Sequence, residues 1–172
     1  MSRPTPLPTH AAPFTAQAAI DSPLGPLTAL ATPQGLAGLW FDAQQHHPGE
    51  LDVRVDAQDR HIVAARAWLG AYWAGRPTPP IALDPQGTPF QQAVWRALRT
   101  IARGRTSTYG EIAAHAGRPG GARAAGAAIG RNPLSIIVPC HRVIGRDGSL
   151  TGYAGGLHRK EALLQLEGVL LA

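Results

Sequence analysis

The spacing of apolar residues changes near the middle of the chain. Over residues 16–41, short apolar runs are separated by turn signals, a pattern typical of an antiparallel meander. The turn signals are Ser22-Pro23, Gly25-Pro26 and Pro33-Gln34-Gly35. Residues 59–75 then place apolar side chains at helical spacing, which predicts one helix packed on that sheet. These patterns predict a small α/β domain over residues 16–84.

Short amphipathic helices are expected in the second half. Capping boxes at 88–91 ("TPFQ") and 108–111 ("TYGE") each begin a helix, and the second helix should end near Gly117. After the turn "RPGG", the segment "ARAAGAAIG" predicts a third helix ending at Gly130. A helix, a glycine-containing turn and a second helix form the skeleton of a helix-turn-helix. Residues 85–172 are therefore predicted to be a mostly helical second domain.

The third of these helices has an unusual composition. Apart from Arg123 and Ile129 it contains only alanine and glycine, so a partner could approach its backbone closely. The alternative is a small buried helix packed against its neighbours, and the presence of Arg123 favours the first interpretation.

Other segments have simpler interpretations. Residues 1–15 are rich in Pro, Thr and Ala, which predicts a disordered tail. Residues 76–87, with four prolines, are interpreted as a linker. The run "LSIIVPC" is short and β-branched and predicts a buried strand that ends at Cys140. The segment "LHRKEALLQLEG" predicts a final helix closing at Gly168.

Charge is distributed unevenly between the two halves. The whole chain carries a formal net charge of +5. Residues 1–84 hold five arginines against seven acidic residues, a net −2, whereas residues 85–172 hold eleven basic against four acidic residues, a net +7. A basic half suggests contact with a polyanion such as nucleic acid. The alternative is a basic surface that serves only solubility.

Composition also limits the class of protein. A single cysteine excludes an intrachain disulfide and a four-cysteine zinc site, and His46-His47 lacks metal-ligand spacing, so we expect no metal and no cofactor. No apolar run approaches the ~20 residues of a membrane span, and the first residues lack the apolar core of a secretion signal. We therefore expect a cytoplasmic protein with no membrane partner.

The candidate chemistry centres on Cys140, which stands between Pro139 and His141 and is followed by Arg142. A lone cysteine is usually an inert small hydrophobe. However, a thiol beside Arg or protonated His has a lowered pKa and becomes a nucleophile. Because successive strand residues point to opposite faces, either Pro139 turns the chain or His141 reaches the sulfur through a water.

A histidine that acts as a base normally has its other nitrogen held by a carboxylate or carbonyl. The basic half has four acidic residues: Asp147 lies in a predicted turn and Glu111 is engaged by its capping box. Of the remaining two, Glu161 and Glu167, the second lies at the end of the final helix and is the better candidate.

Several motifs occur in an order that resembles a known family. The motifs are "TPFQQAVWRALRTIARGRTSTYGEIA", "ARAAGAAIGRNP", "VPCHRVIG" and "TGYAGGLHRKEALLQLEG". They resemble the O6-alkylguanine-DNA alkyltransferases from about Thr88 to Gly168. The resemblance implies a first domain like that of ribonuclease H. It also implies a DNA repair protein, a monomer, that flips O6-alkylguanine out of double-stranded DNA and transfers the alkyl group irreversibly to its own Cys140.

The resemblance also implies catalytic roles. Cys140 would be the nucleophile, His141 the base acting through a water, and Glu167 the carboxylate that orients the histidine. Tyr109 would help to rotate the flipped nucleotide's phosphate and would contact the guanine ring. Asn132 would tie the recognition helix to the cysteine loop.

Further residues would bind the base and the DNA. The backbone at Val143 and Ala154 would read the base, and Lys160 would lie near the pocket. Arg123 would enter the base stack from a helix-turn-helix in the minor groove. Ala122 and Ala124, its neighbours on the same helix, would contact the DNA.

Two departures and two alternatives accompany this interpretation. Ala102 stands where the family commonly has proline, and Ala154 replaces a serine of some relatives.

A non-enzymatic lesion sensor or DNA-binding regulator could use the same helix-turn-helix, but alkyltransferase-like sensors lack the cysteine. A cysteine hydrolase could use Cys140 and His141, but it would have no need of the helix that carries Arg123.

Overall fold

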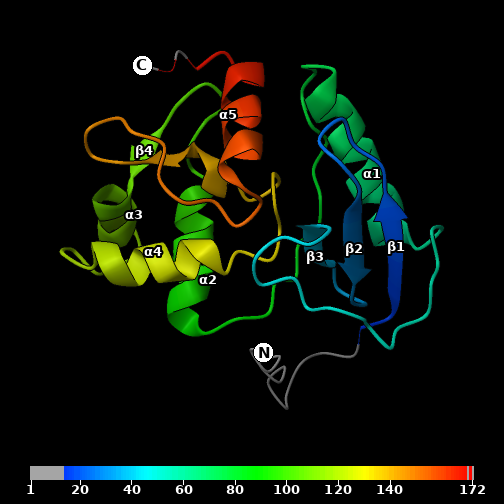
Figure 1. Cartoon of the computed structure of the whole chain (residues 1–172). Helices are drawn as coiled ribbons and strands as arrows, with labels where there is room; N and C mark the ends of the chain where they lie inside the picture. The colour runs from blue at the N-terminus through cyan, green and yellow to red at the C-terminus, as the bar shows by residue number, and fades with distance from the viewer. Residues whose placement is uncertain (1–13, 170, 172) are drawn as a thin grey trace. The chain divides into compact units, whose positions relative to one another are not determined.

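The computed structural model describes residues 14–169 and 171, and these form two compact units (Figure 1). The first unit comprises the described residues up to Ala43 together with His47–Gln86, and the second comprises Gln44–His46 and the chain from Gly87 onward. Most of the tail predicted over residues 1–15 lies outside the described residues. Thr15, however, donates its backbone N–H to Ala31 at 2.9 Å, so paired structure begins inside that range.

A three-stranded sheet forms the first unit, as the turn signals predicted. Strands β1 (Ala16–Ile20), β2 (Leu27–Ala31) and β3 (Leu36–Phe41) are antiparallel in the order β1-β2-β3. Every residue of β3 is buried, whereas exposure alternates along β1. Because apolar residues dominate all three strands, this sheet supplies most of the unit's core.

Both outer strands of this sheet are covered by additional chain. Gln17 of β1 bridges Val55, and Leu36 of β3 bridges Leu83. The Leu36 amide donates to Ala82 at 2.9 Å and its carbonyl accepts from Asp84 at 2.8 Å. The predicted linker over 76–87 is thus fastened to the sheet near its end, which leaves fewer open strand edges.

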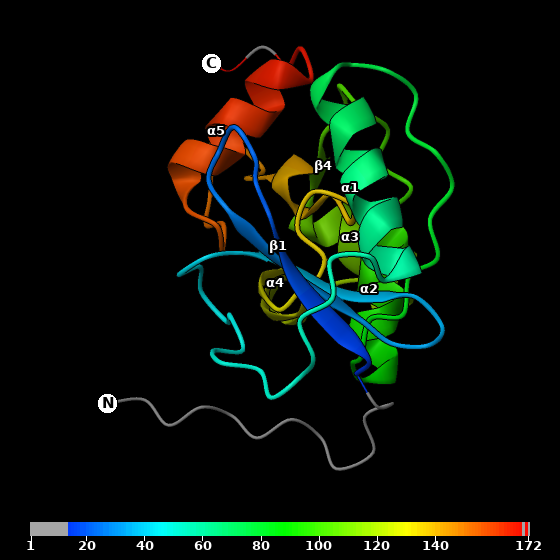
Figure 2. The ribbon, with the colours of Figure 1, turned by 90° about the vertical axis from the view of Figure 1, so that its right-hand side faces the viewer.

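Helix α1 (Arg60–Trp73) packs against this sheet (Figures 1 and 2). Asp59 caps its N-terminus by accepting hydrogen bonds from two backbone amides of the first turn. Ile62, Leu69 and Tyr72 are buried, consistent with the predicted helical spacing. The first unit is therefore the α/β arrangement expected from the sequence.

Four helices form most of the second unit. They are α2 (Pro89–Leu98), α3 (Tyr109–His115), α4 (Ala122–Gly130) and α5 (Leu157–Leu166). Both predicted capping boxes are formed, and Gly117 and Gly168 adopt positive φ just after α3 and α5. Among residues 14–169 and 171, no helix is long and apolar enough to cross a membrane.

Two short connections link these helices. The indole N–H of Trp95 in α2 donates to Ala128 of α4 at 2.9 Å. Strand β4 (Ser107–Thr108), immediately before α3, pairs in parallel with β5 (Val143–Ile144), which directly follows the cysteine turn. The β4–β5 pair therefore fixes the start of α3 relative to the cysteine turn.

The prediction of a strand that ends at Cys140 is wrong. Residues 135–137 form a turn, Val138 lies at a bend, and Cys140–Arg142 form a 3-10 helix, η1. Ile136 has φ +73°, which interrupts any extended strand. The apolar run is buried as expected, but side-chain hydrogen bonds rather than a ladder satisfy part of its backbone.

Candidate active site around Cys140

Asn132 organises the loop that carries the cysteine. Its side-chain N–H2 donates to Val138 at 2.9 Å and to Leu134 at 3.4 Å, while its side-chain oxygen accepts from the Leu134 amide at 2.9 Å. The same side chain also opposes the rise in the pKa of the Cys140 thiol that burial causes. Since Asn132 lies just after α4, it fixes that helix end to the cysteine loop.

Cys140 lies at the start of η1 and is only 7% exposed. Burial raises the pKa of its thiol, an effect opposed by the Asn132 hydrogen bond, by the charge of Lys160 and by nearby backbone N–H groups. Arg142, which follows closely in the chain, binds Glu167 and is not among the groups that lower this pKa. The sulfur is a thiol at neutral pH and needs a base.

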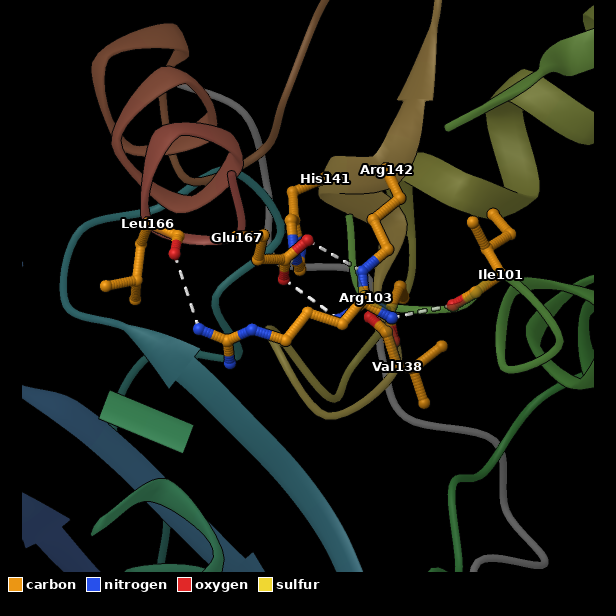
Figure 3. A network of polar contacts seen from close by, with 8 residues as sticks. Ile101, Arg103, Val138, His141, Arg142, Leu166 and Glu167 are labelled. Carbon is orange, nitrogen blue, oxygen red and sulfur yellow. Dashed lines mark hydrogen bonds and ion pairs between the residues drawn. The ribbon is translucent and has the colours of Figure 1, made fainter. Parts of the chain in front are cut away.

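A buried ion pair lies next to the cysteine in the chain (Figure 3). His141 Nε2 lies 2.7 Å from Glu167 Oε1. Arg142 Nε and Nη2 each donate to Glu167 at 2.9 Å, and Arg142 Nη1 donates to the carbonyl of Ile101 at 2.7 Å. Glu167 thus holds both residues that follow the cysteine, and the sequence-based choice of Glu167 over Glu161 agrees with this geometry.

Protonation states follow from these contacts. Burial lowers the pKa of His141 despite the opposing effect of Glu167, so the imidazole is neutral. Burial alone would raise the pKa of Glu167, but the hydrogen bonds from His141 and Arg142 lower it to about 2. Because a carboxylate only accepts, Nε2 of His141 carries the proton. Its Nδ1 is buried without a hydrogen-bond partner among the described residues and can accept a proton.

Lys160 is fully buried on α5. Its ammonium donates to the carbonyls of Val143 at 2.5 Å and Thr151 at 2.8 Å. Burial lowers its pKa to about 8, against the opposing effect of Cys140. Lys160 therefore ties the chain after the cysteine to the loop before α5 and places a positive charge near the sulfur.

A cavity of about 190 Å³ opens beside the sulfur. The residues that line it are Gln45, Tyr109, Gly126, Ile129, Gly130, Cys140, Gly152, Tyr153 and Ala154. The hydroxyl of Tyr109 lies 2.8 Å from that of Thr151, so the ring at the start of α3 is held against the loop before α5. The cavity has the thiol in its wall and several glycines around it, which leaves room for a flat group.

Helix α4 presents a different surface. Arg123 and Ala122 are exposed and Ala124 is partly exposed. A groove of about 720 Å³ lies at the N-terminal ends of α3 and α4, with Tyr109, Ala122 and Arg146 among its lining residues. Tyr109 lines both the groove and the cavity, so the two hollows meet at one side chain.

The predicted site residues fall into separate places. Tyr109 and Ala154 line the cavity with Cys140, whereas Val143 lies outside the lining found in the described part of the chain. The Val143 amide donates to Cys140 and its carbonyl accepts from Lys160. Arg123 lies on the exposed helix and not in the cavity wall.

Three features were missed by the sequence analysis. Gln45 lines the cavity although it is far from Cys140 in sequence. Thr151 holds Tyr109 and accepts from Lys160. Arg142 binds Glu167 through two nitrogens. Only Arg142 had a local signal, its place beside His141. Within residues 14–169 and 171, no group of three or more His, Cys, Asp or Glu side chains could hold a metal ion.

The chain matches known proteins over most of its length. Residues 89–169 match the family described as 6-O-methylguanine DNA methyltransferase, DNA binding domain. The methylated-DNA–protein-cysteine methyltransferase of Mycobacterium tuberculosis is 50% identical over 149 residues, covering 86% of this chain and 89% of the relative. The chain belongs to the methylated-DNA–protein-cysteine methyltransferase family. The Shigella flexneri member is 45% identical over 164 residues, covering 88% of this chain and 95% of its own.

Solved structures of this methyltransferase family share the fold. The Mycobacterium tuberculosis OGT crystallised with DNA is 48% identical, with a TM-score of 0.80 over 89% of this chain and 92% of its own. The O6-methylguanine-DNA methyltransferase of Pyrococcus kodakaraensis strain KOD1, at 24% identity and a TM-score of 0.61, supports the fold alone. The family resemblance stated from the motifs is confirmed.

Proposed function

We propose that this methyltransferase repairs O6-methylguanine and other O6-alkylguanines in duplex DNA by moving the alkyl group to Cys140. The observation that carries the proposal is the neutral His141, held by Glu167 directly after a buried thiol that lines a small cavity. Activation of that thiol for one attack is the chemistry this arrangement suits best.

Base flipping follows from burial of the thiol. Cys140 lies in the cavity wall with 7% of its surface exposed, so it cannot reach a base inside a stacked duplex. The damaged nucleotide must leave the stack, which costs a few kcal/mol. Arg123, exposed on α4, fills the vacated place, and Ala122 and Ala124 allow the helix to approach the minor groove closely.

The transfer itself is a displacement at the alkyl carbon. The thiol proton passes through a water to Nδ1 of His141, and Glu167 stabilises the imidazolium that forms. The sulfur–carbon bond forms as the carbon–O6 bond breaks, and guanine leaves with the electron pair. Tyr109 at the cavity wall supplies a hydrogen bond to the departing base, whose oxyanion or ring nitrogen then takes a proton.

Binding of the flipped base uses the chain around the cavity. Ala154 lines the cavity and offers its backbone, while Lys160 holds the backbone of Val143 in place through its carbonyl. Asn132 keeps α4 and the cysteine loop together, so DNA bound on the helix lies in register with the thiol. The thioether product cannot be hydrolysed in the site, so each monomer acts once.

Intact-protein mass spectrometry tests this proposal. The protein is incubated with a duplex that contains one O6-methylguanine, and the modified peptide is mapped. We expect one added methyl group on Cys140 and an end of activity at one equivalent. Cys140→Ala should bind the damaged duplex without repairing it. Tight binding of the lesion by an unmodified wild-type protein would instead indicate a lesion sensor, and repeated turnover would indicate a hydrolase.

A further inference from the structure

The segment Gln44–His46 packs with the second unit although the residues on either side of it belong to the first. Two hydrogen bonds hold it there. The hydroxyl of Ser135, in the cysteine loop, donates to the side chain of Gln44 at 3.1 Å in a buried contact. The amide of Gln45 donates to the carbonyl of Ala154 at 3.0 Å. The segment therefore bridges the cysteine loop and the loop that precedes α5.

The backbone is strained immediately before this segment and at its last residue. Ala43 and His46 both have left-handed conformations, with φ of 61° and 62°. Residues with a Cβ seldom adopt such angles. Local preference therefore does not place Gln45; its own backbone hydrogen bond to Ala154 and the contact of Gln44 with Ser135 do.

Gln45 is one of the residues that line the cavity beside Cys140. It lines this cavity with Tyr153 and Ala154, yet the residue is exposed to solvent. These two facts place Gln45 at the mouth. Because several other lining positions are glycines, long side chains such as that of Gln45 determine how much of the space is filled.

We propose that Gln45 is a specificity-determining residue that limits the size of the group entering the cavity at Cys140. The inference rests on the proposed function, under which that group is the O6 substituent of a flipped guanine. A longer side chain at this position narrows the mouth, and a shorter one widens it. One extra or missing methylene group in an apolar pocket changes discrimination between substrates by roughly 10–200-fold.

The experiment compares Gln45→Trp, Gln45→Ala and the wild type. The control is Gln34→Trp, which makes the same change at an exposed turn of the first unit. Each protein is reacted with duplexes that contain O6-methylguanine or O6-benzylguanine, and the rate of Cys140 modification is measured. We expect Gln45→Trp to lower the benzyl-to-methyl rate ratio at least tenfold and Gln45→Ala to raise it severalfold. The control ratio should stay within twofold of the wild type.

A second arm without DNA separates this inference from the proposed function. Cys140 is the chain's only cysteine, so iodoacetamide and N-benzyl iodoacetamide report on it alone. In each reaction the sulfur–carbon bond forms, iodide leaves with the electron pair, and the thiol proton passes to solvent. The bulky-to-small rate ratio should fall with Gln45→Trp and rise with Gln45→Ala.

Each outcome decides between the two proposals. If the haloacetamide ratio stays within twofold of the wild type in both Gln45 variants, Gln45 does not limit the cavity and the inference is overturned. If the haloacetamide ratio falls with Gln45→Trp and rises with Gln45→Ala, Gln45 limits the cavity. If, in addition, the wild type takes no methyl group from DNA, the proposed repair function is wrong although the inference on Gln45 holds.

Discussion

The cysteine site and helix α4 belong to the same unit but treat their charged side chains differently: the first buries and pairs them, and the second exposes one. Around Cys140, the side chains of His141, Arg142 and Glu167 are buried, and Glu167 binds both of the others. On α4, Arg123 is exposed, and its side chain makes no hydrogen bond within residues 14–169 and 171. The first region is organised before any substrate arrives, because buried charges must be paired. The second leaves its cation available for an external anion.

This difference separates two kinds of mutational effect. Substitutions in the buried site should lower stability together with activity, since they leave charges or hydrogen-bonding groups unpaired. Substitutions on α4 should slow repair and leave stability almost unchanged. This distinction is contradicted if both kinds of effect occur together in one region, or if they are exchanged between the two regions.

Glu167→Gln should have the largest effect on stability. Without the carboxylate, Arg142 is a buried charge with no counter-ion, and unfolding should become easier by about 3–5 kcal/mol. Urea denaturation followed by tryptophan fluorescence measures this loss. Glu161→Gln, at an exposed position of the same helix, should stay within about 0.5 kcal/mol of the wild type. Equal losses in the two variants would contradict the importance of the buried pair.

Acid should weaken the same site. The folded pKa of Glu167, about 2, lies below the ordinary 4.5, so its contribution is complete above about pH 4.5 and is lost as the pH falls toward 2. A shift of that size corresponds to about 3 kcal/mol. The lowered pKa of His141 adds a loss below its ordinary 6.5, because the unfolded chain then binds the extra proton. Urea midpoints measured between pH 7 and pH 3 should therefore decrease, and flat midpoints would exclude this linkage.

Asn132→Ala should have a smaller effect on stability. The change removes the side-chain partners of the Val138 carbonyl and the Leu134 amide, both inside a buried loop, and should cost about 1–3 kcal/mol. Ser149→Ala removes a hydrogen bond in an exposed turn and serves as the control, with a loss below about 0.5 kcal/mol. The cysteine loop should also move relative to α4, so the transfer rate should fall by more than the loss of folded protein explains.

Arg123→Ala should have the smallest effect on stability, within about 0.5 kcal/mol, yet should slow methyl transfer from duplex DNA about tenfold. Arg99→Ala removes the same charge from an exposed position at the end of α2. Single-turnover rates at fixed salt distinguish the two variants. If both slow transfer equally, Arg123 contributes only general charge and does not enter the base stack.

The sequence predicted the elements whose signals are local. The two capping boxes and the glycines after α3 and α5 each act within a few residues, and the structure contains all of them. The prediction of a strand over 134–140 was wrong because β-branched residues indicate extended backbone only when a partner strand is available. Here Asn132 satisfies the backbone instead, and Ile136 turns left-handed.

The site was predictable where chemistry restricts the choice. Glu167 could be selected because the basic half has so few carboxylates. The binding of Arg142 to the same carboxylate could not be predicted, because this contact depends on the angle at which α5 ends beside η1. The position of Gln45 at the cavity was likewise hidden, because only the folded chain brings it to Ala154.

The short β4–β5 pair sets the spacing between the two sides of the cavity. Ser107 pairs with Val143, and Thr108 pairs with Ile144. Tyr109 therefore lies one residue after the paired Thr108, and Cys140 lies three residues before the paired Val143. The distance between the Tyr109 ring and the Cys140 sulfur therefore depends on how many residues separate each of them from this strand pair. A residue inserted into the exposed loop before Ser107 would leave that count intact. One inserted between Cys140 and Val143 would change it, and the two sides of the cavity would lose their match.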